Sequence, residues 1–285
     1  MEQPMPEQIK FVLFLVLSLL LTGTSAAQTK ACSDSLPTDS ARVLPFHIGE
    51  RLVFRLRYGF VKAGVAEMKV LGKKTDGGCE VLHIQSTARS IGSFDWFYKV
   101  RDVINVYLDP QTLYPIHFEK LLREGRYMAD TYVDYFQQDS LAKVTYIRYK
   151  RKNKIRKKEQ YSVKIPPGVF DALSVIYYVR TLPLEPGKPV FVTNHEKKKV
   201  YTLKILVYPK ETITVKAGTF RCVRIEPLLA GEGIFKHEGK LNIWLTDDTL
   251  KIPVRLTTKV IVGHIAAELE KIEGVPEPIP ARIKR

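Results

Sequence analysis

A run of cationic side chains at residues 148–158 is the most conspicuous chemical feature of the sequence. Eight of its eleven positions hold Lys or Arg, and Asn153 at its centre predicts the tip of a hairpin that begins at Leu141 and ends at Lys164. Such a hairpin would attract anions, which in a cell envelope include lipid headgroups and acidic polymers. Equally, the charges could only keep an exposed sheet edge from pairing. The residues expected to contact anions are Arg148, Lys150, Arg151, Lys152, Lys154, Arg156, Lys157 and Lys158.

Aromatic side chains gather in other segments and could line a cavity for an apolar ligand. They could equally fill the interior of a small barrel, because such interiors are usually packed by their own side chains. Both interpretations are compatible with the sequence. The residues expected to contact a ligand are Phe94, Trp96, Phe97, Tyr98, Phe170, Tyr177 and Trp244.

Motifs for hydrolysis or metal binding are missing from the sequence. It contains no Gly-x-Ser-x-Gly elbow and no His-Glu-x-x-His pair, and its six His residues are scattered. Asp95, Asp102 and Asp171 would resemble a glycosidase site only if two of them converged within about 5–9 Å. We expect Asp95 and Asp171 to cap helical turns instead. The sequence therefore predicts no catalytic residue, no metal and no cofactor.

The N-terminus predicts export. Residues 11–21 form an apolar core with Ser18 as its only polar member, and small residues follow at 22–27. Eleven residues rise only about 16 Å as a helix, which is too short to span a membrane. Residues 1–27 are therefore predicted to be a secretory signal peptide cut before Gln28. Lys30, two residues before Cys32, argues against a lipidation site.

The predicted export limits which partners a positively charged chain can bind. The chain holds 45 Lys and Arg against 30 Asp and Glu, a net charge of +15. In a bacterial periplasm or envelope we expect a lipid, a lipoprotein or another anionic envelope component as partner, with peripheral membrane contact possible. Nucleic acid is excluded by compartment, although the charge alone would permit it.

Cysteine pairing has two alternatives in an exported chain. Cys79 and Cys222 both lie in strand-like runs, whereas Cys32 lies in the N-terminal segment. An oxidising compartment permits a Cys79–Cys222 disulfide, but free Cys is also commonly buried as a small apolar residue.

Strands must position most of these side chains. From Gly49 onward apolar and polar residues alternate, for example over 52–58, 66–70 and 201–207, which is typical of half-buried antiparallel strands. Short turn signals separate about thirteen strand candidates and favour a meander. One amphipathic helix is predicted over 169–182, from Asp171 as N-cap to Pro183, and a shorter helical turn over 93–98.

Several of these segments, in this order, resemble an exported bacterial family, the domain of unknown function 3108. The resemblance covers about residues 46–272 and has no established activity attached to it. It is carried by residues 46–52, Gly64, and residues 95–102, 171–180 and 243–248.

The hairpin sequence at 107–118 is also similar to one in periplasmic lipoprotein carriers of the LolA/LolB kind. That resemblance implies a strongly curved antiparallel sheet, an incomplete barrel, that wraps a hydrophobic cavity for acyl chains and is closed by helices. Residues 244–256 repeat the same pattern, Asp turn followed by Thr-Leu and a Pro. Shared turn chemistry and an internal duplication both explain the repeat.

These observations predict an all-β fold: a strongly curved sheet or incomplete barrel with one amphipathic helix packed against it. We expect a signal peptide at 1–27, a flexible segment at 28–45, a single β-rich domain at 46–273 and a Pro-rich tail at 274–285, extended or disordered with nothing to bury. The predicted function is non-enzymatic binding of a lipid or other amphiphile in the curved sheet. The alternative is an interaction module that docks an anionic envelope partner through its basic hairpin.

Overall fold

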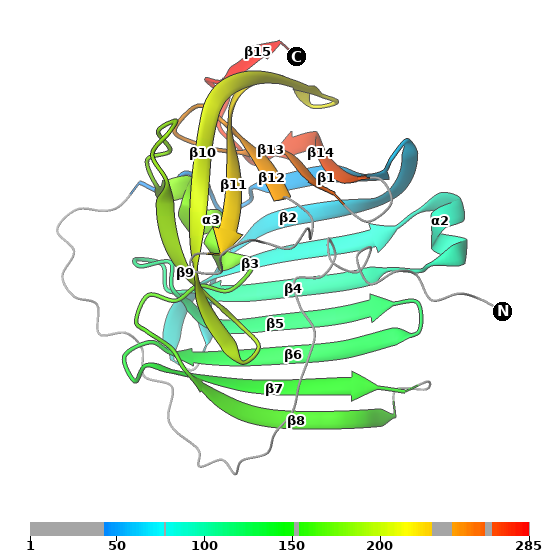
Figure 1. The fold of residues 1–285 in the computed structure, drawn as a ribbon, viewed down its shortest axis with the longest axis vertical. Coiled ribbons are helices and arrows are strands. Elements are labelled where there is room, and N and C mark those ends of the chain that lie inside the picture. The colour runs from blue at the N-terminus through cyan, green and yellow to red at the C-terminus, as the bar shows by residue number, and fades with distance from the viewer. Residues whose placement is uncertain (1–42, 77, 151–153, 230–240, 260–263, 285) are drawn as a thin grey trace.

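The computed structural model describes residues 43–284 except 77, 151–153, 230–240 and 260–263. The predicted signal peptide, most of the predicted flexible segment and Cys32 lie outside this part of the chain. The described residues form one antiparallel sheet with helices α2 (Gly92–Phe97) and α3 (Ser174–Thr181) (Figure 1). The strands before α3 are β1 (Arg51–Tyr58), β2 (Val61–Asp76), β3 (Cys79–Ser90), β4 (Arg101–Leu108), β5 (Pro115–Glu124), β6 (Tyr127–Phe136), β7 (Leu141–Tyr149) and β8 (Ile155–Lys164). Those after it are β9 (Val190–Glu196), β10 (Lys199–Val215), β11 (Gly218–Leu229), β12 (Leu241–Thr246), β13 (Pro253–Lys259), β14 (His264–Glu273) and β15 (Arg282–Lys284).

Consecutive strands pair throughout, because short turns join them. The order across the sheet is β8-β7-β6-β5-β4-β3-β2-β1-β14-β13-β12-β11-β10-β9, and β15 adds to β11. The pairing of β1 with β14 joins the two halves, and β8 and β9 end the path without pairing to each other. The sheet is therefore a curved, incomplete barrel of fifteen strands, and the predicted all-β class is confirmed.

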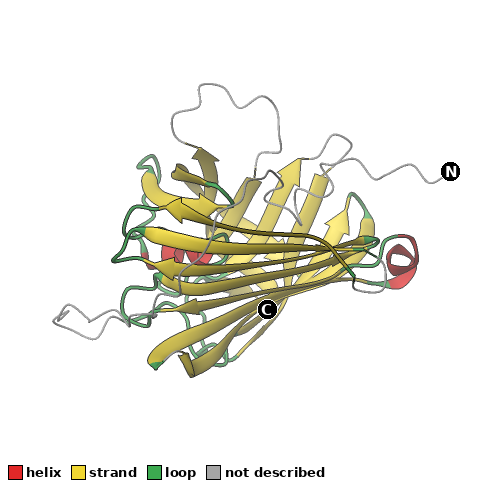
Figure 2. Ribbon diagram, turned by 90° about the horizontal axis from the view of Figure 1, so that it is seen from below, coloured by secondary structure: helices red, strands yellow, loops and turns green. Residues whose placement is uncertain are grey.

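The helix α3 lies within the curve of the sheet, at the end opposite to α2 (Figure 2). Its residues Tyr177 and Val179 are buried in the two hydrophobic clusters that fill this end. Arg180, fully buried, makes a bidentate ion pair with Glu50, with N–O distances of 2.6 and 2.8 Å. The pair fixes the helix to the segment that leads into β1.

The predicted helix at 169–182 is shorter than expected at its start. Phe170 forms an isolated parallel bridge with Asn194 of β9, so it is held as extended chain. Asp171 follows, and its carboxylate accepts hydrogen bonds from the backbone N–H groups of Leu173 (2.7 Å) and Ser174 (3.0 Å). These bonds satisfy donors that the first helical turn leaves free.

The two similar sequence patterns form hairpins of the same local geometry, β4–β5 and β12–β13. Asp109 Oδ1 accepts two backbone N–H groups, at 2.8 and 2.9 Å, ahead of Leu113, which has a φ of 63°. Asp248 Oδ1 accepts two, at 3.0 and 3.1 Å, and Lys251 has a φ of 43°. The predicted shared turn chemistry is therefore present. The hairpins also hold the same place in two successive meanders, β1–β6 and β9–β14.

The expectation that the Pro-rich tail, residues 274–285, has nothing to bury is wrong. Ile279 and Ala281 are 3% and 0% exposed, and the chain then pairs with β11 as β15. The three prolines favour an extended backbone, which can lie along a sheet and place single side chains into the core. The sequence of this segment lacks the alternation of apolar and polar residues from which a strand is predicted.

Candidate ligand-binding cavity

A cavity of about 510 Å³ lies against one face of strands β5–β8, and the turn between β9 and β10 forms its opposite wall. The strand register explains which side chains line it, because residues paired across antiparallel strands point to the same face. Three cross-strand rows result, and they follow one another along the strands. The rows are Phe118–Val133–Val144–Tyr161, Lys120–Thr131–Tyr146–Glu159 and Leu122–Ala129–Arg148–Lys157.

The lining changes from apolar to cationic along these rows. Phe118, Val133 and Val144 are buried and belong to the main hydrophobic cluster. Two rows further along, towards the β7–β8 turn, Arg148 and Lys157 face each other across β7 and β8. The β5–β8 wall of the cavity thus has an apolar end and a cationic end.

Arg148 is held in place at the cationic end. Its guanidinium stacks on the Tyr127 ring, 3.6 Å from the centroid, and donates a 2.8 Å hydrogen bond to the Met128 carbonyl. Lys157 makes an ion pair with Glu159 on the same strand. These contacts orient the cations without removing them from the cavity wall, since both residues line it.

The opposite wall is anchored by His195. Its Nε2 lies 2.7 Å from the Lys197 carbonyl oxygen, which can only accept, so Nε2 carries the proton. Nδ1 then accepts from the Tyr135 hydroxyl at 3.1 Å. Burial lowers the pKa of His195, so the ring is neutral near pH 7. His195 therefore ties the β9–β10 turn to β6.

Glu196 and Lys197, next in the chain, have strongly shifted acidities. Burial raises the pKa of Glu196 to about 7, although the Tyr201 hydroxyl donates a 2.8 Å hydrogen bond to it. Burial lowers the pKa of Lys197 to about 8. The Lys197 Nζ is buried and has no hydrogen-bond partner among the described residues. A buried ammonium without an acceptor is costly, and an anion in the cavity would satisfy it.

Two further lysines complete the charge of the cavity. Burial lowers the pKa of Lys120, and the nearby carboxylates of Glu196, Glu124 and Asp102 act in the opposite direction. Lys198 Nζ lies 4.9 Å from the centre of the Tyr161 ring on β8. This contact joins the β9–β10 turn to the far edge of the sheet, so the cavity lies where the two ends of the incomplete barrel approach each other.

The predicted anion-contacting residues divide between the cavity and the outer surface. The hairpin strands begin at Leu141 and end at Lys164, as predicted. Arg148, Arg156 and Lys157 line the cavity, whereas Lys150, Lys154 and Lys158 are exposed outside its lining. Arg151 and Lys152 lie outside the described residues.

The seven predicted ligand-contacting aromatics do not form one group, and none lines the cavity. Phe94, Trp96 and Phe97 lie in α2, followed by Tyr98. Phe170 and Tyr177 are buried around α3, and Trp244 is half-buried on β12. The aromatic residues that do line the cavity lie at inward positions of β5–β8, where only the register distinguishes the two faces. They are Phe118, Tyr127, Tyr135, Tyr146 and Tyr161.

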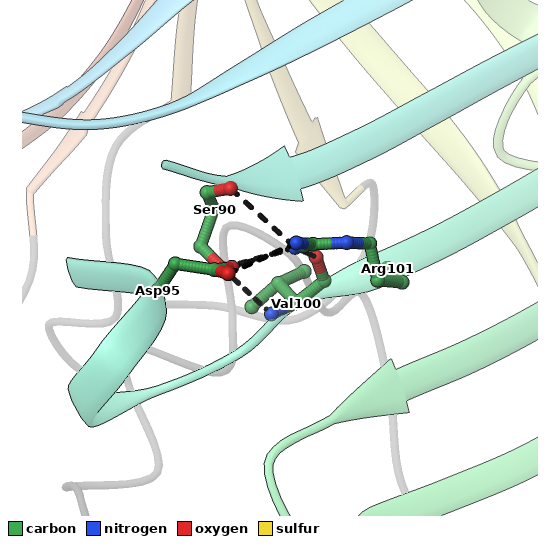
Figure 3. Close-up of polar contacts among 4 residues, drawn as sticks. All are labelled: Ser90, Asp95, Val100 and Arg101. Carbon is green, nitrogen blue, oxygen red and sulfur yellow. Dashed lines mark hydrogen bonds and ion pairs between the residues drawn. The ribbon is translucent and has the colours of Figure 1, made fainter. Parts of the chain in front are cut away.

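The three candidate carboxylates have separate structural roles. Asp95 does not cap α2; it lies within the helix and pairs with Arg101 at 2.6 Å (Figure 3). Asp102 is buried, and its burial raises its pKa to about 6. Asp171 precedes α3, as described above. The described residues contain no group of His, Cys, Asp or Glu side chains that could hold a metal ion, and Cys222 is a free, buried thiol.

The fold and the cavity define an incomplete antiparallel barrel with an internal, amphiphilic cavity. The chain belongs to the DUF3108 family, described as proteins of unknown function, whose sequence model matches residues 53–270. The predicted family resemblance is confirmed. No curated protein matches the chain. The similarity to the LolA/LolB carriers stays a prediction. In the described part of the chain, no helix has the length and apolar character needed to cross a membrane.

Three solved structures of bacterial proteins are similar to this chain over most of its length. A β-barrel-like protein of the DUF1849 domain from Brucella abortus has 11% sequence identity and a TM-score of 0.46, and the match covers 79% of this chain and 97% of that one. A protein assigned as a lipoprotein from Parabacteroides distasonis has 12% identity and a TM-score of 0.35, with 82% and 100% covered. A protein assigned as exported, with a YmcC-like fold, from Bacteroides fragilis has 10% identity and a TM-score of 0.33, with 80% and 97% covered.

Proposed function

We propose that the protein is an exported, periplasmic or envelope-associated binding protein without catalytic activity, and that it holds an anionic amphiphile in the β5–β8 cavity. The observation that carries this proposal is the buried Lys197 ammonium, which faces the cavity and lacks a hydrogen-bond acceptor among the described residues. An anionic headgroup supplies that acceptor in a charge-assisted bond.

The two ends of the cavity suit the two parts of such a ligand. The apolar chain would pack on the row that contains Phe118, Val133 and Val144, where burial of hydrocarbon provides the affinity. The headgroup would pair with the Lys197 ammonium, and Arg148 at the cationic end of the sheet wall would add to the attraction. An uncharged amphiphile would leave these cations unpaired, so the cavity favours an anion.

The pKa values of Glu196 and Lys197 predict how ligand binding changes with pH. Below pH 7 Glu196 is protonated and neutral, and below pH 8 Lys197 is charged. As the pH rises through this interval, the cavity gains a negative charge and loses a positive one. We expect affinity for an anionic amphiphile to fall between pH 6.5 and pH 8.5, and Glu196→Gln to remove only the part of the fall that ionisation of Glu196 causes.

The test compares dodecanoic acid with dodecanol by titration calorimetry on the purified protein. We expect the acid to bind more tightly, and Lys197→Gln to weaken it by about tenfold or more, since hydrogen bonds to charged groups contribute about 1.5–3 kcal/mol. Lys199→Gln, which changes an exposed lysine two residues away, is the matched control and should alter affinity less than about twofold. Equal binding of acid and alcohol, or equal effects of the two variants, would refute the proposal.

The interaction module predicted from the sequence remains a second candidate, favoured by the outward hairpin cations. Lys150, Lys154 and Lys158 are exposed and do not line the cavity. If they dock an anionic envelope partner, replacing all three by Ser should abolish salt-sensitive retention on envelope fragments. Lys197→Gln should leave that retention unchanged.

A further inference from the structure

One end of the sheet collects alternate turns of the meander. Because consecutive antiparallel strands reverse direction, the β1–β2, β3–β4, β5–β6 and β7–β8 connections all lie at the same end, on the right of Figure 1. The helix α2 is the β3–β4 connection. Ile91, the residue before the helix, donates a 3.1 Å hydrogen bond from its N–H to the Ala63 carbonyl of β2, so the helix lies beside the β1–β2 turn.

This end exposes large apolar side chains. Phe60 in the β1–β2 turn is 94% exposed, and Trp96 and Phe97 of α2 are 83% and 77% exposed. The Trp96 and Phe97 rings contact each other edge to face, with centroids 4.9 Å apart. Val61 adds a half-exposed aliphatic side chain. Aromatic side chains are usually buried in a core, and a group of them at one end indicates an interaction surface.

A polar clamp holds α2 so that these rings project outward (Figure 3). The Arg101 guanidinium donates to both carboxylate oxygens of Asp95, at 2.6 and 3.0 Å, and Ser90 Oγ donates a further, short bond to Asp95. Ser90 Oγ also accepts from Val100 N at 2.8 Å, across the ends of β3 and β4. Arg101 thereby lowers the pKa of Asp95 to about 2, so the clamp is charged at physiological pH.

Exposed cations surround the aromatic end. They are Lys62, Arg89, Lys99, Lys150 and Lys154.

We propose that this end docks on an anionic phospholipid bilayer, with Phe60, Trp96 and Phe97 inserted at the headgroup level. Trp and Phe favour that interface, and cations around them are attracted by the negative surface potential. The opposite end of the sheet would then face away from the lipid. The inference goes beyond the proposed ligand and does not depend on the cavity, because none of the three aromatic residues lines it.

The sequence offers a direct probe, since it contains only two Trp residues. In a Trp244→Phe background, fluorescence reports Trp96 alone. With vesicles of phosphatidylcholine and phosphatidylglycerol we expect a blue shift and loss of acrylamide quenching, both reversed by high salt. Vesicles of phosphatidylcholine alone should produce a much smaller change. An unchanged Trp96 spectrum with anionic vesicles would overturn the proposal.

Vesicle sedimentation tests the aromatic residues themselves. The double variant Phe60→Ser, Phe97→Ser should lower the vesicle partition coefficient of the protein roughly tenfold or more, because it removes apolar area from the interface. The matched control is Phe191→Ser on β9, which removes a Phe that is 58% exposed but lies outside this end. Lys197→Gln should bind vesicles as wild type. Equal effects of the two Phe changes, or a patch that instead mediates dimerisation in sedimentation velocity, would contradict membrane docking.

Discussion

The buried ion pair between Arg180 and Glu50 gives the sharpest test of what holds α3 within the curved sheet. Both side chains are essentially inaccessible, at 0% and 1% exposure. The guanidinium also donates to the carbonyl oxygens of Pro45 (2.9 Å) and Leu250 (3.1 Å), so it joins the helix to two other segments. Arg180→Met leaves the Glu50 carboxylate buried and uncompensated. Breaking such a pair costs about 3–5 kcal/mol, which for a domain of this size lowers the Tm by about 6–20 °C.

Thermal and denaturant unfolding of the wild type and three variants measures the contribution of this pair to stability. Arg180→Met should show the full loss, and the double variant Glu50→Met with Arg180→Met should recover most of it, since apolar replacement of both charges is close to neutral. Lys73→Met is the control, because the Lys73–Glu80 pair has a similar 2.7 Å distance but both partners are about half exposed. Its loss should stay below about 1 kcal/mol. If Arg180→Met cost no more than Lys73→Met, or if the double variant were no more stable than the single one, the reasoning would be wrong.

Three further predictions concern the cavity and the strand geometry. The folded-state pKa of Glu196, about 7, exceeds its ordinary 4.5, so stability should fall as the pH rises from 4.5 to 7, by at most about 3 kcal/mol. The denaturant midpoint should fall less across that pH range in Glu196→Gln than in the wild type. The same dependence of the midpoint on pH in both proteins would contradict the raised pKa of Glu196. A Cβ on Gly64 would lie 2.5 Å from the Arg89 carbonyl oxygen of β3, so Gly64→Ala should destabilise the fold by about 1–3 kcal/mol in equilibrium unfolding. Asp109 and Asp248 bind their turns alike, but Asp248 Oδ2 also accepts the Ala281 N–H at 3.0 Å, so Asp109→Ala should cost about 0.5–2 kcal/mol and Asp248→Ala more; a smaller loss for Asp248→Ala would refute this order.

Strands and turns could be predicted because their signals are local. Alternation of apolar and polar residues follows from the two-residue repeat of a strand, and the hairpin from Leu141 to Lys164 appears with the predicted bounds. The predicted helix began too early in the chain, and the reason is a non-local contact. Phe170 fits a helical apolar pattern, but its pairing with Asn194 of β9 holds it in extended chain.

The candidate site could be predicted only in part. The cationic hairpin was recognised from composition, and alternation implies that half of its charges share one face. Whether Arg148 faces the cavity is decided by its pairing with Ala129 and Lys157, which belong to β6 and β8. Lys197 had no distinguishing signal, because its burial depends on the β9–β10 turn folding over strands about 40–80 residues away in the chain.

The sequence by itself determined the family, the all-β class and the chemical inventory: cations in one hairpin, aromatics in short segments and no catalytic motif. Local periodicity and turn chemistry carry that information, because each depends on residues a few positions apart. Tertiary structure alone decided which side chains meet. It separated the predicted aromatics into a buried group around α3 and an exposed group at α2, and it brought Lys197 and Arg148, distant in the chain, to the lining of one cavity. Those outcomes depend on how the ends of an open sheet approach each other, and that is set by twist and packing summed over all fifteen strands.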